Sequence, residues 1–246
     1  MKKIFLRIDD IGASTKKYEI YSKFGFGIGN ILFLKYIKPF KAWGPYSEMK
    51  ADDWNKVFDI LNSSNSKLTV GVTATWVERD GTMVPFPEKY PAQSELLKNA
   101  DKDGLIEIAN HGLTHCVVGK HLPNLFSGNR KYHREFWDWQ PKKIHGDHIN
   151  KSQLIFKDWL GKSPTTLIPP GNVYSADTLR ASEKNGIKII NSYMNFDIKS
   201  NIKIINDASI DPFHDKELVE QGLGFLEKKI KSYNGEVEFK LLKDFE

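Results

Sequence analysis

Short apolar runs alternate with longer amphipathic stretches along most of the chain. The runs KKIFLRI (2–8) and KLTVGVTA (67–74) have the length and aliphatic content that predict buried strands. The stretch MKADDWNKVFDILNSS (49–64) has apolar residues at helical spacing and acidic residues in its first turn, which predicts a helix. The same patterns predict strands at 105–110, 187–190, 201–206 and 208–213, a strand entering a Pro-Pro-Gly turn at 165–172, and helices at about 92–101, 150–161, 175–186 and 216–233.

This alternation of strands and helices predicts an α/β fold with a largely parallel sheet, either open or closed into a barrel. Two stretches fit the alternation poorly. Residues 17–48 are rich in Gly, Phe and Tyr, and residues 117–147 contain YHREFWDWQP. Long segments of this kind in compact domains are usually functional or mobile. We therefore expect one catalytic domain over residues 1–246 with insertions at about 17–48 and 117–147.

The composition is that of an ordinary soluble globular protein, with 40% hydrophobic and 27% charged residues among 246. The formal net charge is +5 and the pI about 9.0. The lysines are scattered and form no run of five, which argues against a nucleic-acid groove. This basic balance is compatible with an anionic substrate.

Cys116 is the single cysteine, so an intrachain disulfide and multi-cysteine zinc patterns are excluded. The opening MKKIFLRIDD is followed by no apolar secretion segment or small-residue cleavage site. No stretch approaches the roughly 18 apolar residues that a membrane span needs. These features predict a cytoplasmic protein without a membrane span. The sequence leaves the oligomeric state open.

Polar residues that can carry chemistry follow four of the predicted strands. In parallel α/β folds the carboxyl ends of the strands form one rim, where active sites are built. We therefore expect these four clusters to lie near one another. They are Asp9 and Asp10, His111 and His115, the segment 169–172, and His214 with Asp215.

Two histidines four residues apart can bind one metal ion if their segment coils into a helical turn. A carboxylate from Asp9 or Asp10 then completes the three protein ligands of a catalytic zinc site. Neighbours in an extended strand point to opposite sides, so one aspartate is expected to bind the metal. The other is expected to act as the base for a water that the metal activates. The side chain of Cys116 is expected to point away from His111 and His115.

His214 is a candidate to give a proton to a leaving amine, with Asp215 or Asp211 holding its tautomer. Gly171 is the first residue after two prolines with a backbone N–H, and this amide is a candidate donor to a tetrahedral oxyanion. Each cluster alone also has an ordinary explanation as a turn, a helix cap or a coincidence. Their joint placement at predicted strand ends favours an active site.

Four motifs resemble those of the polysaccharide deacetylase family, family four of the carbohydrate esterases. RIDDIG (7–12) resembles its Asp-Asp-Gly motif, and NHGLTH (110–115) its Asn-His-Ser/Thr-x-x-His motif. IPPGN (168–172) resembles its Arg-Pro-Pro-Tyr-Gly motif, and PFHD (212–215) its late histidine motif. The four motifs occur in the order of the family.

The resemblance implies a distorted (β/α) barrel of about seven parallel strands with loop insertions. It implies a divalent metal, usually zinc, bound by Asp10, His111 and His115. Asp9 would be the general base and His214 the general acid. The reaction would be hydrolysis of an N-acetyl group from an amino sugar, which releases acetate.

Three positions depart from the family motifs. Ile168 stands where the family has an arginine that contacts the base carboxylate, and we hypothesise that Arg7 substitutes for it. Gly112 stands where serine or threonine is usual. Gly171 stands where an aromatic residue is usual, which we expect to open the pocket. These departures predict a divergent member with an unusual substrate.

Five residues are expected around the oxyanion or the substrate. Trp137 and Trp139, with Tyr132 and His133, are predicted to form a lid that stacks on sugar rings. The alternative is that these aromatic residues pack the insertion onto the barrel. The five residues are Arg7, Trp137, Trp139, Gly171 and Asn172.

The leading prediction is a metal-dependent de-N-acetylase that acts on a saccharide or on a sugar-linked precursor in surface glycan biosynthesis. A cytoplasmic location favours a nucleotide- or lipid-linked precursor. Three alternatives remain open: a metal-dependent hydrolase of another amide or ester, an inactive barrel that binds glycan or a partner, and a nucleic-acid-binding protein. The last is expected to lose affinity steeply with salt, and no nucleic-acid-binding motif supports it.

Overall fold

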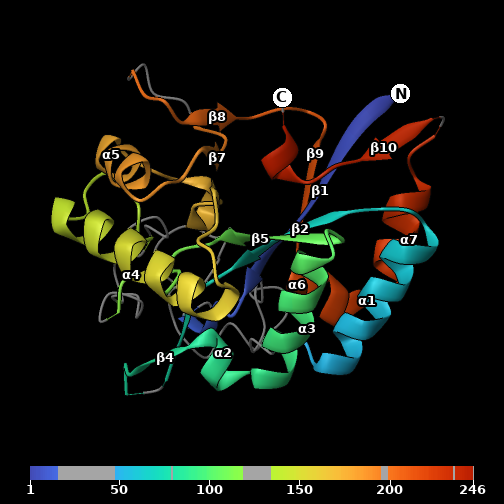
Figure 1. Ribbon diagram of the computed structural model, residues 1–246, viewed down its shortest axis with the longest axis horizontal. Helices are drawn as coiled ribbons and strands as arrows, with labels where there is room; N and C mark the ends of the chain where they lie inside the picture. The colour runs from blue at the N-terminus through green and yellow to red at the C-terminus, as the bar shows by residue number, and fades with distance from the viewer. Residues whose placement is uncertain (16–47, 79, 119–133, 195–198, 235, 246) are drawn as a thin grey trace, which may run out of the picture.

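The computed structural model describes the chain except for residues 16–47, 79, 119–133, 195–198, 235 and 246 (Figure 1). The predicted insertion at 17–48 therefore lies almost wholly outside the described residues. The predicted insertion at 117–147 is described only at its two ends.

The first strand, β1 (Lys2–Ile11), pairs with more than one other strand of the parallel sheet. Its residues Leu6–Ile11 pair with β2 (Leu68–Val72), and its residues Phe5–Asp9 pair with β9 (Ile210–His214). The sheet then continues through β5 (Ile106–Asn110), β6 (Thr166–Leu167), β7 (Ile189–Asn191) and β8 (Lys203–Ile205), all parallel.

These seven parallel strands, in the order β9-β1-β2-β5-β6-β7-β8, curl into a half-barrel with helices around it. The predicted distorted (β/α) barrel of about seven parallel strands is confirmed. A further short strand, β10 (Val237–Phe239), pairs with the first residues of β1. The carboxyl ends of β1, β5 and β9 carry the predicted polar clusters, so the fold places those clusters at one rim.

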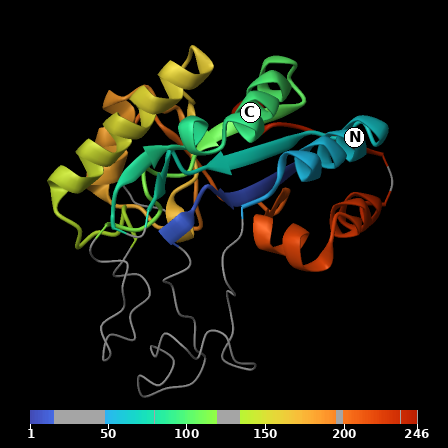
Figure 2. The same ribbon diagram turned by 90° about the horizontal axis from the view of Figure 1, so that it is seen from below.

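The helices form two groups beside the strands. Figure 2 shows α4 and α5 gathered on one side of the strands and α1, α6 and α7 on the other. A short antiparallel hairpin, β3 (Thr75–Val77) and β4 (Met83–Pro85), lies outside the main sheet. The helices are α1 (Ala51–Ser63), α2 (Phe86–Lys89), α3 (Pro91–Lys102), α4 (Lys142–Leu160), α5 (Ala176–Lys184), α6 (Asp215–Gln221) and α7 (Gly224–Lys231), with 3-10 turns η5 (Pro170–Asn172) and η6 (Leu242–Asp244).

The main core lies between the strands and the apolar faces of α1, α3 and α7. Leu6, Ile8 and Val70 of the central strands are fully buried, and so are Trp54 and Leu61 of α1. Strands that are covered on both faces read as near-continuous apolar runs, which is why β1 and β2 were recognisable in the sequence.

Several boundaries differ from the predictions. The single helix predicted at 216–233 is wrong, because the chain breaks at Gly222 (φ 75°) into α6 and α7. The strand predicted at 2–8 continues through both aspartates to Ile11. Helix α4 begins at Lys142, so its first turns belong to what was predicted as an insertion. It ends as predicted at a glycine, Gly161, in the left-handed conformation.

Within the described ranges, none of the helices combines the length and the apolar character that crossing a membrane requires.

Two leucines on helices test the assignment of the core. Leu61 of α1 is fully buried, whereas Leu154 of α4 is 52% exposed. Leu61→Ala removes buried apolar surface and leaves a cavity, so we expect it to lower the free energy of unfolding by about 2–5 kcal/mol. Leu154→Ala is the matched control and should change it by about 0.5 kcal/mol or less. Denaturant unfolding measures both, and equal losses would contradict the assigned core.

Candidate metal centre

The two aspartates sit on an irregular part of β1. Ile8 pairs with Val70 and Ile11 with Val72, so β1 has one residue more than β2 between these two pairs. This is a β-bulge, and it coincides with a positive φ of 76° at Asp10. The bulge breaks the strict alternation of an extended strand. The side chains of Asp9 and Asp10 therefore both reach the rim.

The histidine segment follows β5 as a curled loop. The predicted helical turn is wrong, since residues 111–115 form bends without helix. Positive φ values of 89° at Gly112 and 65° at His115 curl the backbone instead. The two imidazole centroids of His111 and His115 consequently lie 5.3 Å apart.

Asp10, His111 and His115 converge on one point. Asp10 Oδ1 lies 3.1 Å from His111 Nε2 and 3.1 Å from His115 Nε2. The three ligand atoms all lie within 4.8 Å of one another, and all three residues are buried. One carboxylate and two imidazoles are the ligand types of a catalytic zinc site with an open coordination position.

The hydrogen bond of His111 Nδ1, the ring nitrogen that does not face Asp10, indicates whether a cation fits at Nε2. This Nδ1 lies 2.7 Å from the carbonyl oxygen of Ile168, so Nδ1 carries the proton and donates. In the neutral ring, Nε2 then presents a lone pair toward the carboxylate of Asp10, and a cation between the two acceptors relieves their repulsion. A backbone carbonyl that fixes the tautomer is typical of metal-binding histidines. The residues present fit a divalent ion.

Asp9 lies beside this cluster, and Arg7 binds one of the two carboxylate oxygens of Asp9. Arg7 Nη2 donates to Asp9 Oδ2 at 2.6 Å, and both side chains are buried. Among the residues that the structure describes, Asp9 Oδ1 has no hydrogen-bond partner although it is buried. A Cβ on Gly71 would lie 3.3 Å from this oxygen and 3.5 Å from His111 Cγ. The second carboxylate oxygen of Asp9 and the His111 ring therefore both border the space at Gly71, and this oxygen can accept a proton.

The arginine that contacts Asp9 comes from β1 and not from the third motif. Arg7 also donates to Asn172 Oδ1 at 3.0 Å and to Asn191 Oδ1. The contact that we hypothesised between Arg7 and Asp9 is present. The side chain of Asn172 accepts from Arg7, and its predicted place near the substrate stays a prediction.

His214 belongs to the same rim, because it pairs in register with Asp9 on the neighbouring strand. Its Nε2 lies 3.8 Å from Asp10 Oδ2, and its Nδ1 lies 3.5 Å from Glu217 Oε2. Burial raises the pKa of Glu217, but the hydrogen bond and the charge of His214 outweigh burial and hold it below its ordinary value. Asp211, one of the two aspartates predicted to hold the tautomer of His214, contacts Tyr233 and Lys229 instead. The role predicted for Asp215 stays a prediction.

The third motif, IPPGN (168–172), forms a short turn, and Arg134 lies against Gly171 in this turn. Gly171 has φ 66°, and a Cβ there would lie 2.9 Å from Arg134 Nε. The expectation that Gly171 opens the pocket is therefore wrong, since the guanidinium of Arg134 occupies that space. A role for the Gly171 amide toward an oxyanion stays a prediction.

Arg134 also contacts the second histidine. Its Nη1 lies 2.8 Å from His115 Nε2 and 3.3 Å from Nδ1. Because ring carbon Cε1 lies between these nitrogens, a donor so close to both cannot lie in the ring plane without colliding with it. Nη1 therefore lies over the face of the ring, where arginine is often found on aromatic side chains. The in-plane lone pair of Nε2 remains available to a metal ion.

The remaining sequence candidates have mixed outcomes. Cys116 Sγ lies 3.6 Å from His115 Nδ1, so the prediction that Cys116 points away is wrong. The rings of Trp137 and Trp139 contact each other with centroids 5.4 Å apart, and Trp139 is 51% exposed. Their lid function stays a prediction. Tyr132 and His133 lie outside the described residues.

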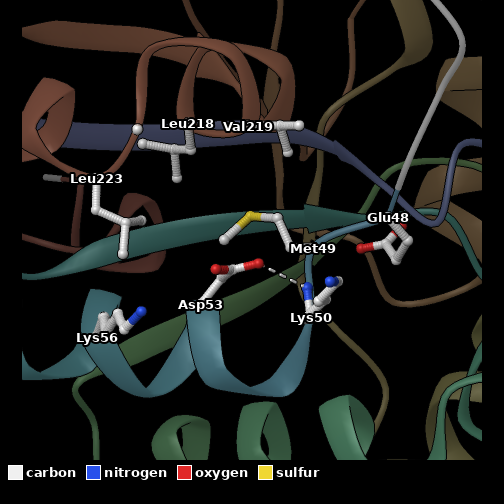
Figure 3. Close-up of a pocket in the computed structure, with 9 residues that line it drawn as sticks. Glu48, Met49, Lys50, Asp53, Lys56, Leu218, Val219 and Leu223 are labelled. Carbon is white, nitrogen blue, oxygen red and sulfur yellow. Dashed lines mark hydrogen bonds between the residues drawn. The ribbon is translucent and has the colours of Figure 1, made fainter.

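A half-open pocket of about 520 Å³ lies between α1 and the pair α6–α7 (Figure 3). Its lining contains none of the residues of the metal cluster. Glu48, one of its lining residues, accepts a hydrogen bond at Oε2 from the Gly12 amide at 2.7 Å. Figure 3 shows mainly Met49, Leu218 and Leu223 facing one another there, so the pocket does not define the site.

Comparison with known proteins places this site in a family. The sequence profile of the family described as polysaccharide deacetylase matches residues 44–190. A search of curated proteins found no match. Three similar solved structures share 12–14% identity with the chain.

The first is a family-four (CE4) pseudoenzyme from Bacillus anthracis, with 12% identity and a TM-score of 0.50, covering 96% of this chain and 63% of that one. The second is a family-four acetyl xylan esterase from Clostridium thermocellum solved with a cobalt ion, with 14% identity, a TM-score of 0.47 and coverages of 99% and 89%. The third is a Mycobacterium smegmatis protein described as a polysaccharide deacetylase, with 13% identity, a TM-score of 0.46 and coverages of 78% and 51%.

The chain thus spans about half the length of the Mycobacterium protein and less than two thirds of the Bacillus protein. At such identities, the likeness to solved structures concerns the fold alone. The profile match, in contrast, extends over more than half of the chain and includes the histidine and Pro-Pro-Gly motifs. This chain belongs to the polysaccharide deacetylase family.

Proposed function

We propose that this protein is a metal-dependent hydrolase that removes an N-acetyl group from an amino sugar in a saccharide or a sugar-linked precursor. The observation that carries the proposal is the convergence of Asp10, His111 and His115 on one point beside Asp9. Membership of the polysaccharide deacetylase family supports deacetylase activity in general. The sugar, its linkage, the pathway and the cellular compartment stay predictions.

Asp10 Oδ1, His111 Nε2 and His115 Nε2 would hold the metal ion. The donor set of two imidazoles and one carboxylate suits zinc. A divalent ion there supplies Lewis-acid chemistry, since it polarises a carbonyl oxygen and makes water more acidic. The hydrogen bond from His111 Nδ1 to Ile168 keeps that ring in the tautomer that binds a metal.

Asp9 is the proposed general base. Hydrolysis of an amide needs a group that takes a proton from the attacking water. Asp9 Oδ1 is buried at the space beside Gly71 that the His111 ring also borders, while Arg7 holds the other carboxylate oxygen. The ion pair with Arg7 thus fixes the orientation of the carboxylate and leaves the second oxygen available to take the proton.

His214 is the proposed general acid. The amine that leaves from the amino sugar needs a proton, and imidazole titrates near neutral pH. His214 is partly exposed, so a substrate can reach its ring, and Glu217 lies next to its Nδ1. Nε2 on the rim side of the ring is the atom that would give the proton. Trp137 and Trp139 remain candidates to contact the sugar.

Metal content tests the site itself. We expect about one equivalent of zinc in the wild-type protein and little in His111→Ala, because two remaining ligands bind zinc much more weakly. His145→Ala is the matched control: His145 of α4 is equally buried but contacts Thr178 of α5 and the backbone oxygen of Gln140, which precedes α4. Elemental analysis after dialysis measures all three proteins. Equal zinc in the His111 and His145 variants would refute the site.

Acetate release from N-acetylated amino-sugar oligosaccharides tests the base. Asp9→Asn keeps the shape of the side chain but removes its basicity, so we expect the kcat to fall by about 10²–10⁴-fold. The zinc content should stay unchanged, whereas Asp10→Asn should lower both. A kcat of Asp9→Asn equal to that of the wild type would exclude Asp9 as the base.

The same assay separates the alternatives. A protein that holds zinc but releases acetate only from simple esters would be a hydrolase of another substrate. A protein without zinc and without activity, which nevertheless binds glycan, would be an inactive barrel.

The pH profile tests the substitute arginine. Arg7→Met removes the cation beside Asp9, and a carboxylate that loses such a neighbour is protonated more easily. We expect the acidic limb of the kcat/KM profile to move to higher pH by about one unit or more. Arg180→Met, which removes an exposed arginine paired with Asp177, is the control. An unchanged rate and profile in Arg7→Met would dispose of the substitution hypothesis.

A further inference from the structure

Glu135 is a fully buried carboxylate that lies inside the curl of the histidine loop. Its Oε2 accepts a hydrogen bond from the Leu113 amide at 3.0 Å. Its Oε1 accepts from the Thr114 amide at 2.7 Å and from the Thr114 hydroxyl at 2.7 Å. His148 Nδ1 lies 2.6 Å from the same Oε1. The contacted residues Leu113 and Thr114 lie between His111 and His115.

The carboxylate occupies the space of a side chain that the loop lacks. A Cβ on Gly112 would lie 2.0 Å from Glu135 Oε2, which no packing allows. Gly112 also has φ 89°, a conformation that only glycine adopts readily. A side chain at position 112 and the carboxylate of Glu135 therefore exclude each other. This explains physically why the motif has glycine where serine or threonine is usual.

The charge of Glu135 strengthens its hold on the loop. Burial raises the pKa of Glu135, but the charge and hydrogen bond of His148 and the hydrogen bonds from Thr114 outweigh burial and place it below its ordinary value. Hydrogen bonds to an ionised carboxylate are about twice as strong as neutral ones. Without Glu135, two buried amides would lose their acceptor.

Arg134, the residue before Glu135, contacts the second histidine and the second glycine. Arg134 Nη1 contacts His115 Nε2, and the Arg134 guanidinium fills the side-chain space at Gly171. Two adjacent residues, Arg134 and Glu135, therefore fill the space at both glycines that depart from the family motifs.

We propose that Glu135 is a positioning residue of the metal centre. Its carboxylate holds the backbone between His111 and His115 in the curl that directs both rings at Asp10. This inference rests on the proposed metal-dependent function. It goes beyond that function because it assigns the geometry of the metal ligands to a residue outside the four motifs.

The zinc dissociation constant of Glu135→Gln tests the proposal. Glutamine keeps the size of the side chain but presents an NH₂ group, which cannot accept from both backbone amides. We expect zinc affinity to fall by about 10–100-fold, the usual effect of changing a residue that supports metal ligands. Competition with a chromophoric chelator measures the constant. Glu135→Asp keeps the charge but shortens the reach, so it should weaken zinc binding in the same way.

Glu107→Gln is the matched control. Glu107 is equally buried and lies on β5, the strand that leads into the histidine loop. It accepts hydrogen bonds from the Thr69 and Thr166 hydroxyls and from the Lys243 amide. Glu107 therefore matches Glu135 as a buried carboxylate acceptor, although burial raises the pKa of Glu107 whereas that of Glu135 is lowered. It lies at the start of the strand, away from the metal ligands. We expect its substitution to leave the zinc affinity unchanged.

Hydrogen exchange of the wild-type protein tests the same idea without a variant. In metal-free protein, the amides of Leu113 and Thr114 should already be protected because Glu135 accepts from both. Rapid exchange that slows only when zinc is added would overturn the proposal. Zinc binding by Glu135→Gln as tight as in the wild type would also overturn it and leave the proposed function intact. A wild-type protein that binds no zinc would instead contradict the proposed function.

Discussion

A single carboxylate oxygen faces two imidazole nitrogens in the interior of this protein. Asp10 Oδ1 lies 3.1 Å from Nε2 of both His111 and His115, and all three side chains are buried. Since His111 Nδ1 donates to a carbonyl, the neutral ring turns an acceptor toward the carboxylate. A cation between these three buried groups would relieve the repulsion between their acceptor atoms, and the proposed metal ion would meet this requirement.

The backbone takes unusual conformations to satisfy that requirement. A bulge and a positive φ at Asp10 bring both aspartates to the rim, and positive φ values at Gly112 and His115 curl the loop. Such conformations cost energy and persist where the surrounding structure compensates for them. Here Glu135 accepts from two amides of the loop, and Arg7 holds Asp9 from the same strand. Arg7 thus makes the contact with Asp9 that we hypothesised, from β1 and not from the third motif.

Much of the fold and the metal cluster was predictable, because both depend on local patterns. Buried runs such as β1 mark parallel strands, and short polar motifs at strand ends mark the rim. The break at Gly222 was missed because the apolar spacing continues across it into α7. The bulge at Asp10 cannot be predicted from the pattern of hydrophobic residues. Arg134 and Glu135 were also missed, because only the aromatic residues of the stretch YHREFWDWQP were predicted to have a function. The role of Glu135 depends on a contact with a loop about twenty residues earlier in the chain, and the spacing of apolar residues does not predict such contacts.

The most direct test of the central claim is a crystal structure of the zinc-loaded protein with anomalous data collected at the zinc edge. We predict one strong anomalous peak, at about 2.0–2.2 Å from Asp10 Oδ1, His111 Nε2 and His115 Nε2. A structure from saturating zinc with no peak between these three atoms, or with zinc bound only elsewhere on the protein, would contradict the account.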